Sequence, residues 1–227
     1  MTIDGWDVLN ANARQFNVIW GYHSINSTSE WLPGNNSPTL FENTIGFKPL
    51  QVILCAKDEG RNAIRMDISR ILAALKGPVS IELDNMDHAF YGILRSFSAE
   101  ETAIKRWHQL TLNLEGYECG RTVTVSGSGS IEIENPGTLP SPAVLTITPT
   151  AGMSNLTIQG LGDVFTIENL QSGETVVIDG ETGLITQGGA LKEVDFYTLP
   201  VVQPGNSTVI ISRSQATVQV DFKPRYM

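Results

Sequence analysis

The sequence predicts a mainly β protein of two domains, an α+β N-terminal domain with one helix and a C-terminal antiparallel β-sandwich. Three observations support this prediction. Apolar and polar residues alternate along much of the chain, only one segment has helical periodicity, and turn residues recur in the second half at intervals of roughly 8 to 12 residues. With 227 residues, 41% of them hydrophobic, the chain is long enough to bury a substantial core.

A tract of alternating Ser and Gly at residues 126–130 marks the predicted domain boundary. Such a tract is typical of a flexible linker, and the composition changes across it. All four Trp residues precede the tract, whereas Thr, Val, Ile, Gly and Pro dominate after it. We therefore expect an N-terminal domain over residues 1–125, a linker over residues 126–130 and a C-terminal sandwich over residues 131–227.

The N-terminal domain is expected to begin with a half-buried strand and an exposed loop. Apolar residues occupy every second position of the strand, at Phe16, Val18, Trp20 and Tyr22. Residues 24–40 then carry Asn, Ser, Gly and Pro at high density, which predicts a mobile loop that extends from the fold. A further apolar strand follows at residues 51–54.

The single helix is expected over about residues 62–76. Its apolar residues have the spacing of one helix face and are Ile64, Ile68, Ile71, Leu72 and Leu75. Asn62 is a suitable N-cap residue, and Gly77 followed by Pro78 is a common helix stop. We expect this helix to lie on a small sheet, because a sheet buries one face against another layer.

Three strands complete the N-terminal domain. Val79, Ile81 and Leu83 lead into a turn at residues 84–87, and a return strand contains Phe90, Ile93 and Phe97. This pattern predicts a hairpin. The last strand is predicted because Leu110, Leu112 and Leu114 alternate with polar residues.

The C-terminal half predicts short strands that are separated by turns. The predicted strands contain residues 131–133, 144–147, 156–158, 165–167, 176–178, 209–212 and 218–222. The turn signals include Asn135-Pro136-Gly137 and the hairpin signal Asp179-Gly180. No repeat with a period of about 20 to 50 residues is present, which argues against a solenoid.

Charge and composition exclude several functions. The formal charge of −9 argues against a sequence-specific nucleic-acid partner, which requires clustered Lys and Arg. The start of the chain lacks signal-peptide features and no apolar stretch of about 18 residues occurs, so we expect synthesis in a cytoplasm and no membrane partner. Cys55 and Cys119 are expected to be reduced core thiols. The Asn-x-Thr sequences at Asn26, Asn155 and Asn206 are interpreted as loop residues.

The sequence contains no recognised catalytic or metal-binding pattern. It lacks the motifs of serine hydrolases, phosphate-binding loops and dinucleotide-binding folds. The histidines His23, His88 and His108 lack the spacing of metal ligands. We therefore predict no enzyme activity, no catalytic residue, no metal site and no cofactor.

Two groups of carboxylates are interpreted as turn and loop residues. Asp84 and Asp87 lie beside a histidine in a predicted turn, where Asp side chains commonly bond the local backbone. Asp163, Asp179 and Glu181 lie in predicted loops, and a calcium site requires more oxygen ligands at closer spacing than they provide.

Several motifs occur in a fixed order along nearly the whole chain. In the first half these are the helix from Ile64 to Leu75, its Gly-Pro stop, the hairpin through Asp84 and a Leu-rich strand ending in Gly116-Tyr117-Glu118-Cys119. In the second half these are Asn135-Pro136-Gly137, Gly173 to Asp179, Leu199-Pro200, Pro204-Gly205-Asn206 and the closing segment from Val218 to Tyr226. In this order the motifs resemble the distal tail proteins of siphophages that infect Gram-positive hosts. Such proteins often have a Cys-x-Asp-Pro-like element after the first domain, whereas this chain has Cys119-Gly120-Arg121.

The resemblance implies a structural function in the virion, at the tip of a phage tail, after assembly in the host cytoplasm. It implies a homo-oligomeric ring, most commonly of six subunits, built by the N-terminal domains, with a galectin-like or carbohydrate-binding-module-like sandwich outside. The implied partners are the major tail tube protein, the tape measure protein, the tail-associated lysin or tip protein, and a receptor-binding protein or host saccharide. The ring would act as a baseplate hub that lets DNA pass.

Two other functions remain open from the residues. A carbohydrate-binding adhesion module for host cell-wall saccharide would use Trp31 and Tyr197, because aromatic rings stack on sugars. The remaining Trp residues, Trp6, Trp20 and Trp107, are expected in the core or in an interface. A wall hydrolase or protease is the third possibility, and the sequence offers no residue set for it.

Overall fold

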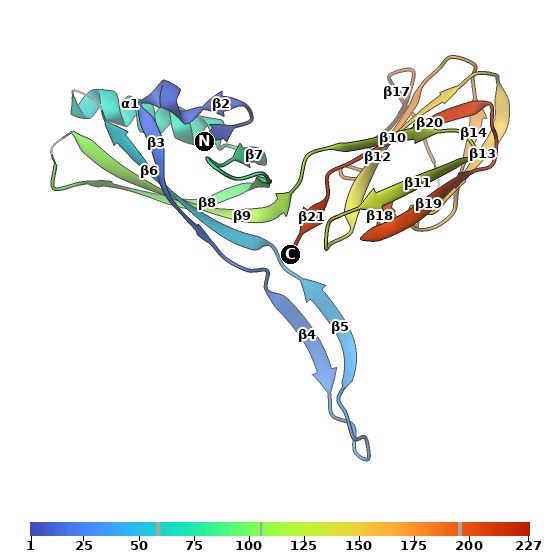
Figure 1. Cartoon of the computed structure of the whole chain (residues 1–227), viewed down its shortest axis with the longest axis horizontal. Coiled ribbons are helices and arrows are strands. Elements are labelled where there is room, and N and C mark those ends of the chain that lie inside the picture. Colours follow the sequence, from blue (N-terminus) through green and yellow to red (C-terminus); the bar gives the residue numbers. More distant parts are fainter. Residues whose placement is uncertain (58–59, 105, 195–196) are drawn as a thin grey trace. The chain divides into compact units, whose positions relative to one another are not determined.

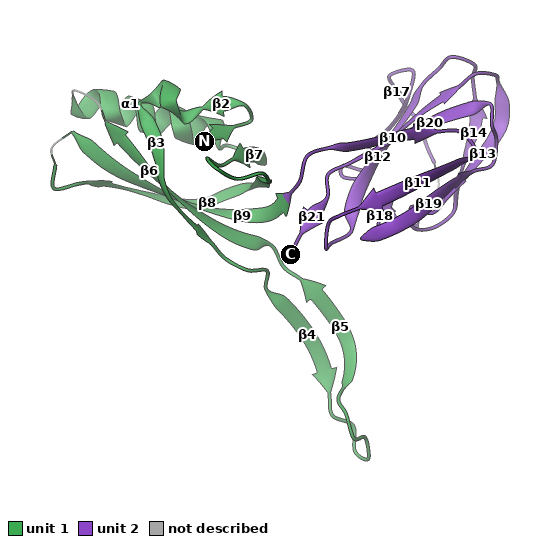
Figure 2. Cartoon of the chain, in the orientation of Figure 1, with its two compact units in different colours: residues 1–118, 227 green, residues 119–226 purple. Residues whose placement is uncertain are grey.

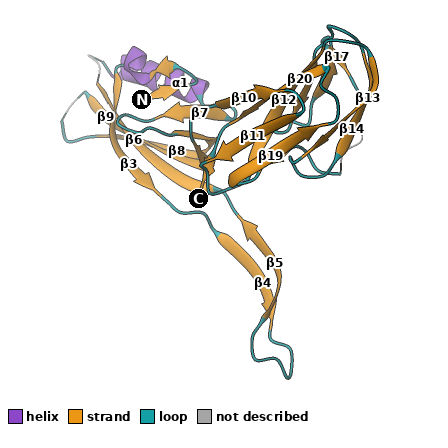
Figure 3. Ribbon diagram, turned by 45° about the vertical axis from the view of Figure 1, so that its right-hand side comes forward, coloured by secondary structure: helices purple, strands orange, loops and turns teal. Residues whose placement is uncertain are grey.

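The computed structural model describes residues 1–57, 60–104, 106–194 and 197–227. The chain divides into two compact units, residues 1–118 with Met227 and residues 119–226 (Figures 1 and 2). Strands dominate both units, and the described residues contain a single α-helix (Figure 3). The mainly β fold with one helix, predicted from the sequence, is therefore confirmed.

The first unit, called unit 1, contains a sheet, a hairpin, a short 3-10 helix (Val8–Ala11) and the α-helix α1 (Arg61–Ala74). Its strands are β1 (Thr2–Ile3), β2 (Trp6–Asp7), β3 (Ala13–Trp20), β4 (Ile25–Glu30), β5 (Thr39–Ile45), β6 (Lys48–Lys57), β7 (Val79–Glu82), β8 (Ala89–Glu101) and β9 (Trp107–Cys119). The sheet has the order β2-β1-β7-β8-β9-β6-β3. The strands β4 and β5 pair separately with each other.

The helix α1 packs its apolar side on this sheet. Ile64, Ile71 and Leu75 are buried, as the helical periodicity predicted. The predicted N-cap was wrong. The helix begins at Arg61, so Asn62 lies within its first turn, and Gly60 in extended backbone takes the cap position without a side-chain hydrogen bond.

The core face of unit 1 is formed by alternate residues of the central strands. Leu110, Leu112 and Leu114 of β9 are buried, as predicted, together with residues of β6 and β8. The predicted alternation in β3 fails at Phe16. A register shift between Gln15 and Asn17 leaves Phe16 unpaired, and its side chain is exposed.

The prediction of a mobile loop over residues 24–40 was wrong for residues 25–30, 39 and 40, which lie in strands. Residues 25–30 form β4, residues 39–45 form β5, and the two strands make an antiparallel hairpin. The cross-strand pairs include Ile25 with Ile45 and Thr28 with Glu42. Local composition suggested a loop because most residues of these strands are polar and none is buried.

The second unit, called unit 2, is an antiparallel β-sandwich. Its strands are β10 (Val123–Gly127), β11 (Ser130–Asn135), β12 (Ser141–Pro149), β13 (Met153–Gln159), β14 (Phe165–Leu170), β15 (Val176–Asp179), β16 (Ile185–Gln187), β17 (Ala190–Leu191), β18 (Val201–Val202), β19 (Gly205–Ile211), β20 (Ala216–Phe222) and β21 (Arg225–Tyr226). One sheet has the order β10-β20-β12-β15-β16-β17, with β18 beside β12, and the other has the order β11-β19-β13-β14. Buried residues from both sheets, such as Leu145, Val220, Ile158 and Val209, form one core cluster.

The Gly-Ser tract at residues 126–130 is a corner of this sandwich and not a linker. Gly127 ends β10 and pairs with Val218, whereas Ser130 begins β11 and pairs with Ile210 of the other sheet. Gly129 has a φ of 81°, a conformation that favours glycine. The tract therefore carries the chain from one sheet to the other, and the boundary between the units falls at Glu118 and Cys119.

The Asn-Pro-Gly turn is held by a buried polar network. Asn135 is buried, its Nδ2 donates to the Val202 carbonyl at 3.1 Å, and its Oδ1 accepts from the Gly137 amide at 2.9 Å. A Cβ atom at position 137 would lie 2.6 Å from the Arg225 carbonyl oxygen, so only glycine fits there. The buried hydroxyl of Ser141 accepts from the Arg225 amide at 3.1 Å. The network thus ties β21 to the turn.

Candidate assembly surface

The most prominent surface feature of unit 1 is a two-stranded arm, defined as residues 21–47. In Figure 1 the strands β4 and β5 extend away from the sheet of unit 1, in line with β3 and β6. The pairing of β3 with β6 ends at Trp20 and Leu50, and the pairing of β4 with β5 begins at Ile25 and Ile45. The arm is therefore an outward continuation of the β3–β6 ribbon.

Hydrogen bonds bridge the short gap between the two pairs of strands. The Gly21 amide donates to the Pro49 carbonyl at 2.9 Å, and the Gly46 amide donates to the Ser24 carbonyl at 2.8 Å. The Nδ1 atom of His23 lies 2.6 Å from the Gly46 carbonyl oxygen. His23 thus has a structural contact at the base of the arm.

The two segments of the backbone that enter and leave the arm lie very close together at this base. A Cβ atom on Gly21 would lie 2.3 Å from Pro49 Cγ, and a Cβ atom on Gly46 would lie 2.2 Å from Ser24 Oγ. Both distances are far below van der Waals contact. Space therefore requires glycine at position 21, where the Pro49 ring and carbonyl cannot move away, whereas at position 46 the Ser24 hydroxyl would have to rotate; neither glycine has a positive φ.

Large apolar side chains are exposed along the arm. Tyr22 is 87% exposed and Trp31 is 63% exposed. The full set of exposed large hydrophobic residues of the arm is Tyr22, Ile25, Trp31, Leu32, Leu40, Phe41, Ile45 and Phe47. The arm contains Glu30 and Glu42 but neither Lys nor Arg.

The arm lacks a core of its own. An isolated two-stranded hairpin is marginally stable in water, because stable sheets require further strands or a covering layer. An accumulation of exposed large apolar side chains of this kind is typical of an interaction site. In addition, both long edges of β4 and β5 lack a further paired strand among the described residues, and unpaired edges can accept a strand of another chain.

The histidine at the β7–β8 turn belongs to an ion-pair cluster. His88 Nδ1 lies 2.8 Å from Glu118 Oε1, and Lys48 Nζ lies 2.6 Å from Glu118 Oε2. Burial raises the pKa of the Glu118 carboxyl, but its hydrogen bonds and charge interactions with Lys48 and His88 outweigh this effect and lower the pKa below its ordinary value. Lys48 Nζ also lies 5.0 Å from the centre of the Trp20 ring.

The other residues considered in the β7–β8 turn have separate positions. Asp84 accepts a hydrogen bond from the amino group of Met1, and its backbone amide donates to Gln15 Oε1 at 3.0 Å. Asp87 is exposed. His108 lies on β9, where its Nε2 is buried and has no hydrogen-bond partner among the described residues.

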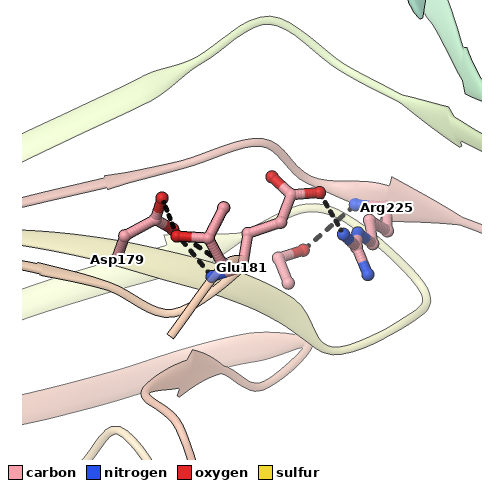
Figure 4. Close-up of polar contacts among 5 residues, drawn as sticks. Asp179, Glu181 and Arg225 are labelled. Carbon is pink, nitrogen blue, oxygen red and sulfur yellow. Dashed lines mark hydrogen bonds and ion pairs between the residues drawn. The ribbon is translucent and has the colours of Figure 1, made fainter. Parts of the chain in front are cut away.

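The loop carboxylates of unit 2 hold turns in place. Asp179 accepts hydrogen bonds from the amides of Glu181 at 2.8 Å and Thr182 at 3.2 Å and from the Thr182 hydroxyl at 2.7 Å (Figure 4). Burial raises the pKa of Asp179, but these hydrogen bonds lower the pKa by a larger amount. The pKa of Asp179 therefore lies below its ordinary value. Arg225 donates to Glu181 at 3.1 Å, and Asp163 accepts from the Thr198 hydroxyl at 3.0 Å.

The two aromatic residues proposed for sugar binding belong to different units. Trp6, Trp20 and Trp107 are partly buried, and Trp31 is the exposed tryptophan. Trp31 belongs to unit 1, whereas Tyr197 belongs to unit 2.

The two cysteines and the three Asn-x-Thr sequences lie in or beside strands of the two units. Neither Cys55 nor Cys119 is in a disulfide; Cys119 is buried, as expected for a core thiol, and Cys55 is partly exposed. The interpretation of Asn26, Asn155 and Asn206 as loop residues was wrong, because they lie in β4, β13 and β19.

Two further structural features bear on function. Across residues 1–57, 60–104, 106–194 and 197–227, no group of three or more His, Cys, Asp or Glu side chains is arranged to hold a metal ion. Within the same residues, no helix has both the length and the apolar character required to cross a bilayer.

Comparisons with known proteins agree on one class of protein. Residues 136–226 match the family described as siphovirus-type tail component, C-terminal domain. This match covers most of unit 2 and includes the Asn135 turn from Pro136 onwards. No curated protein matches the chain at a significant level.

Solved structures extend the likeness over both units. The chain is similar to the SPP1 Dit protein, described as a paradigm of the hub adsorption apparatus in phages that infect Gram-positive hosts, with a TM-score of 0.72, 14% identity and 97% of each chain covered. It is also similar to chains of the phage P2 baseplate in its activated conformation, with Ca (TM-score 0.57, 9% identity, 98% of this chain and 94% of that chain) and with Sr (TM-score 0.55, 11% identity, 95% and 92%). The resemblance to siphophage distal tail proteins is thus confirmed, and the fold is that of the SPP1 hub protein.

Proposed function

We propose that this protein is a structural hub of a phage tail tip, in which copies of the chain assemble into a closed ring through the arm. The observation that carries this proposal is the arm itself, a ribbon with exposed apolar side chains, open strand edges and no core. The similarity of unit 2 to a siphovirus tail component and of the whole fold to hub and baseplate proteins supports the location in the virion.

The arm favours a head-to-tail contact between copies. It extends from one end of the unit 1 sheet, and we propose that it binds a different surface of the neighbouring copy. A contact between two different surfaces generates a ring when its rotation closes, and we propose six subunits, the number that the resemblance to siphophage distal tail proteins implies. The apolar side chains of Phe41 and Ile45 would then be removed from water, which supplies the main free energy of assembly.

The ring would connect several tail components. We propose that one side of the ring binds the major tail tube protein and that the ring also contacts the end of the tape measure protein and the lysin or receptor-binding proteins of the tip. DNA would pass through the central opening. We propose no catalytic step, because the polar clusters described above hold turns and strands in place.

The test is the oligomeric state of the full chain. Size-exclusion chromatography with light scattering should give a multiple of the 24.7 kDa chain mass, and negative-stain images should show a ring with a central hole. The double variant Phe41→Ser/Ile45→Ser should stay a single chain. Ile210→Ser, which removes an equally exposed apolar side chain from unit 2, is the matched control and should assemble normally.

Two results would contradict the proposal. The first is a wild-type chain that remains monomeric at high concentration and also fails to bind tail tube, tape measure or tip proteins. The second is normal assembly of the arm variant. Circular dichroism of each variant excludes unfolding as the reason for lost assembly.

A further inference from the structure

The strand β14 forms an edge of the sandwich in unit 2. It pairs with β13 from Phe165 with Ile158 to Leu170 with Met153, and no described strand lies on its other side. In an antiparallel pair, alternate residues direct their backbone N–H and C=O groups away from the partner. The free side of β14 therefore offers hydrogen-bonding groups to an added strand.

A groove with a volume of about 660 Å³ follows this edge. Phe165 and Thr166, which are neighbours in β14, both line it, although Phe165 points into the core and Thr166 is exposed. Because adjacent side chains of a strand point to opposite faces, a groove that touches both runs along the edge of the strand. Val194 and Tyr197 line it from a separate segment of the chain.

The groove has one sign of charge. Asp163, Glu168 and Glu193 line it, and none of its described lining residues is Lys, Arg or His. The nearby Val164 is exposed and adds an apolar contact. Carboxylates that gather along a low-dielectric wall attract and orient a cationic ligand.

We propose that this groove binds an extended, basic segment of a partner polypeptide, which adds to β14 as a further strand. Backbone hydrogen bonds to β14 would supply much of the affinity, and Lys or Arg side chains would lie against Asp163, Glu168 and Glu193. This inference goes beyond the proposed hub function, because it assigns a binding site to unit 2 and does not require the arm or the ring.

The observations favour a peptide over a saccharide. Tyr197 is 98% exposed, so its ring is not fixed as a stacking wall of the groove, and the ring of Phe165 is 4% exposed and belongs to the core. A saccharide also lacks the regular series of N–H and C=O groups that a strand edge can pair with. An extended polypeptide matches both the edge and the charge.

The experiment uses the full-length chain and a synthetic probe peptide, acetyl-(Lys-Val)₃-amide. Hydrogen exchange with mass spectrometry should show slower exchange in residues 165–170 when the probe is present. Anisotropy of the labelled probe gives its affinity. The double variant Glu168→Gln/Glu193→Gln should bind about tenfold more weakly, and the affinity should fall as salt is added.

Three controls make the test specific. Glu132→Gln/Glu134→Gln removes two exposed carboxylates from β11, the opposite edge of the same sheet, and should leave the affinity unchanged. The probe with Glu in place of Lys should not bind. A probe that is N-methylated at every residue keeps its side-chain charges but has no backbone N–H on either edge to pair with β14, and should also fail to bind.

Each contrary outcome overturns the inference. It is wrong if residues 165–170 are not protected, if the N-methylated probe binds as well as the parent, or if the β11 variant weakens binding equally. Protection of the groove by a chitin oligosaccharide with no effect of the peptide would assign it to sugar. None of these results depends on oligomeric state, so failure here is distinct from failure of the hub proposal.

Discussion

Lys48 and Glu118 form an ion pair at 2.6 Å in which both side chains are largely shielded from solvent, with 8% and 15% of their areas exposed. The pair joins β6 to the end of β9, and His88 contacts the second carboxylate oxygen of Glu118. A buried cation without its partner carries a large desolvation cost, so this cluster is sensitive to the loss of any member. It leads to the first two predictions.

Replacing Glu118 by Gln should destabilise unit 1 by about 2 to 3 kcal/mol, because the buried Lys48 ammonium loses its counter-charge but keeps a polar neighbour. Glu115→Gln is the control, since the Arg95–Glu115 pair is much more exposed and should contribute less than about 1 kcal/mol. Urea unfolding, followed by Trp fluorescence, measures both, since all four Trp residues belong to unit 1. Equal effects of the two substitutions would contradict the conclusion that the buried Lys48–Glu118 pair stabilises unit 1 more than the exposed Arg95–Glu115 pair does.

The stabilisation by Glu118 should depend on pH in one direction. Because folding lowers the pKa of its carboxyl below 4.5, the stabilisation is complete above that value and is lost as the pH falls through the folded-state pKa. The difference in unfolding free energy between wild type and Glu118→Gln should therefore shrink as the pH falls below 4.5 and through the folded-state pKa. A difference that grows on acidification would refute the sign of this shift.

Replacing Asn135 by Ala should destabilise unit 2 by about 2 kcal/mol, because the buried Val202 carbonyl and the Gly137 amide lose a hydrogen-bond partner. Asn155→Ala, on an exposed position of β13, is expected to change stability by less than about 0.5 kcal/mol. Differential scanning calorimetry of the full chain distinguishes the two variants. An unchanged transition for Asn135→Ala would show that the network does not hold the turn.

A methyl group at the base of the arm should push apart the two backbone segments that meet there. Gly21→Ala places a Cβ atom 2.3 Å from Pro49 Cγ, so the ribbon must shift, and the arm should exchange its amide hydrogens faster while β9 remains protected. Gly34→Ala, near the tip of the arm, meets no atom within 4 Å but has a φ of 91°, so it controls for backbone strain without a clash. Faster exchange confined to the tip in both variants would argue against a close crossing at Gly21.

The sequence predicted the parts of the fold in which local pattern and burial agree. The periodicity of Ile64, Ile71 and Leu75 located the helix, and the alternation through Leu112 located the central strand. The order of the motifs along the chain, including Asn135-Pro136-Gly137, indicated the resemblance to siphophage distal tail proteins. In such a motif the residue type follows from its immediate surroundings. Position 137, for example, requires glycine because the Arg225 backbone lies too close for a Cβ atom.

The remaining features depend on pairing between distant residues. Gly127 is in a strand because it pairs with Val218, and no local property of a Gly-Ser tract reveals such a partner. The arm is in strands because Ile25 faces Ile45, although its composition is that of a loop. The groove beside β14 combines Asp163 with Glu193, which the chain brings together only after both sheets have formed.

The strand order of unit 2 also determines when this part of the chain can fold during synthesis. The late strands β19 and β20 are interior strands of the two sheets, where β19 separates β11 from β13 and β20 separates β10 from β12. The early strands β10 and β11 consequently have no partners until residues 205–222 have left the ribosome. Until then their apolar side chains have no sheet in which to pack, so the sandwich is complete only after β19 and β20 have been synthesised.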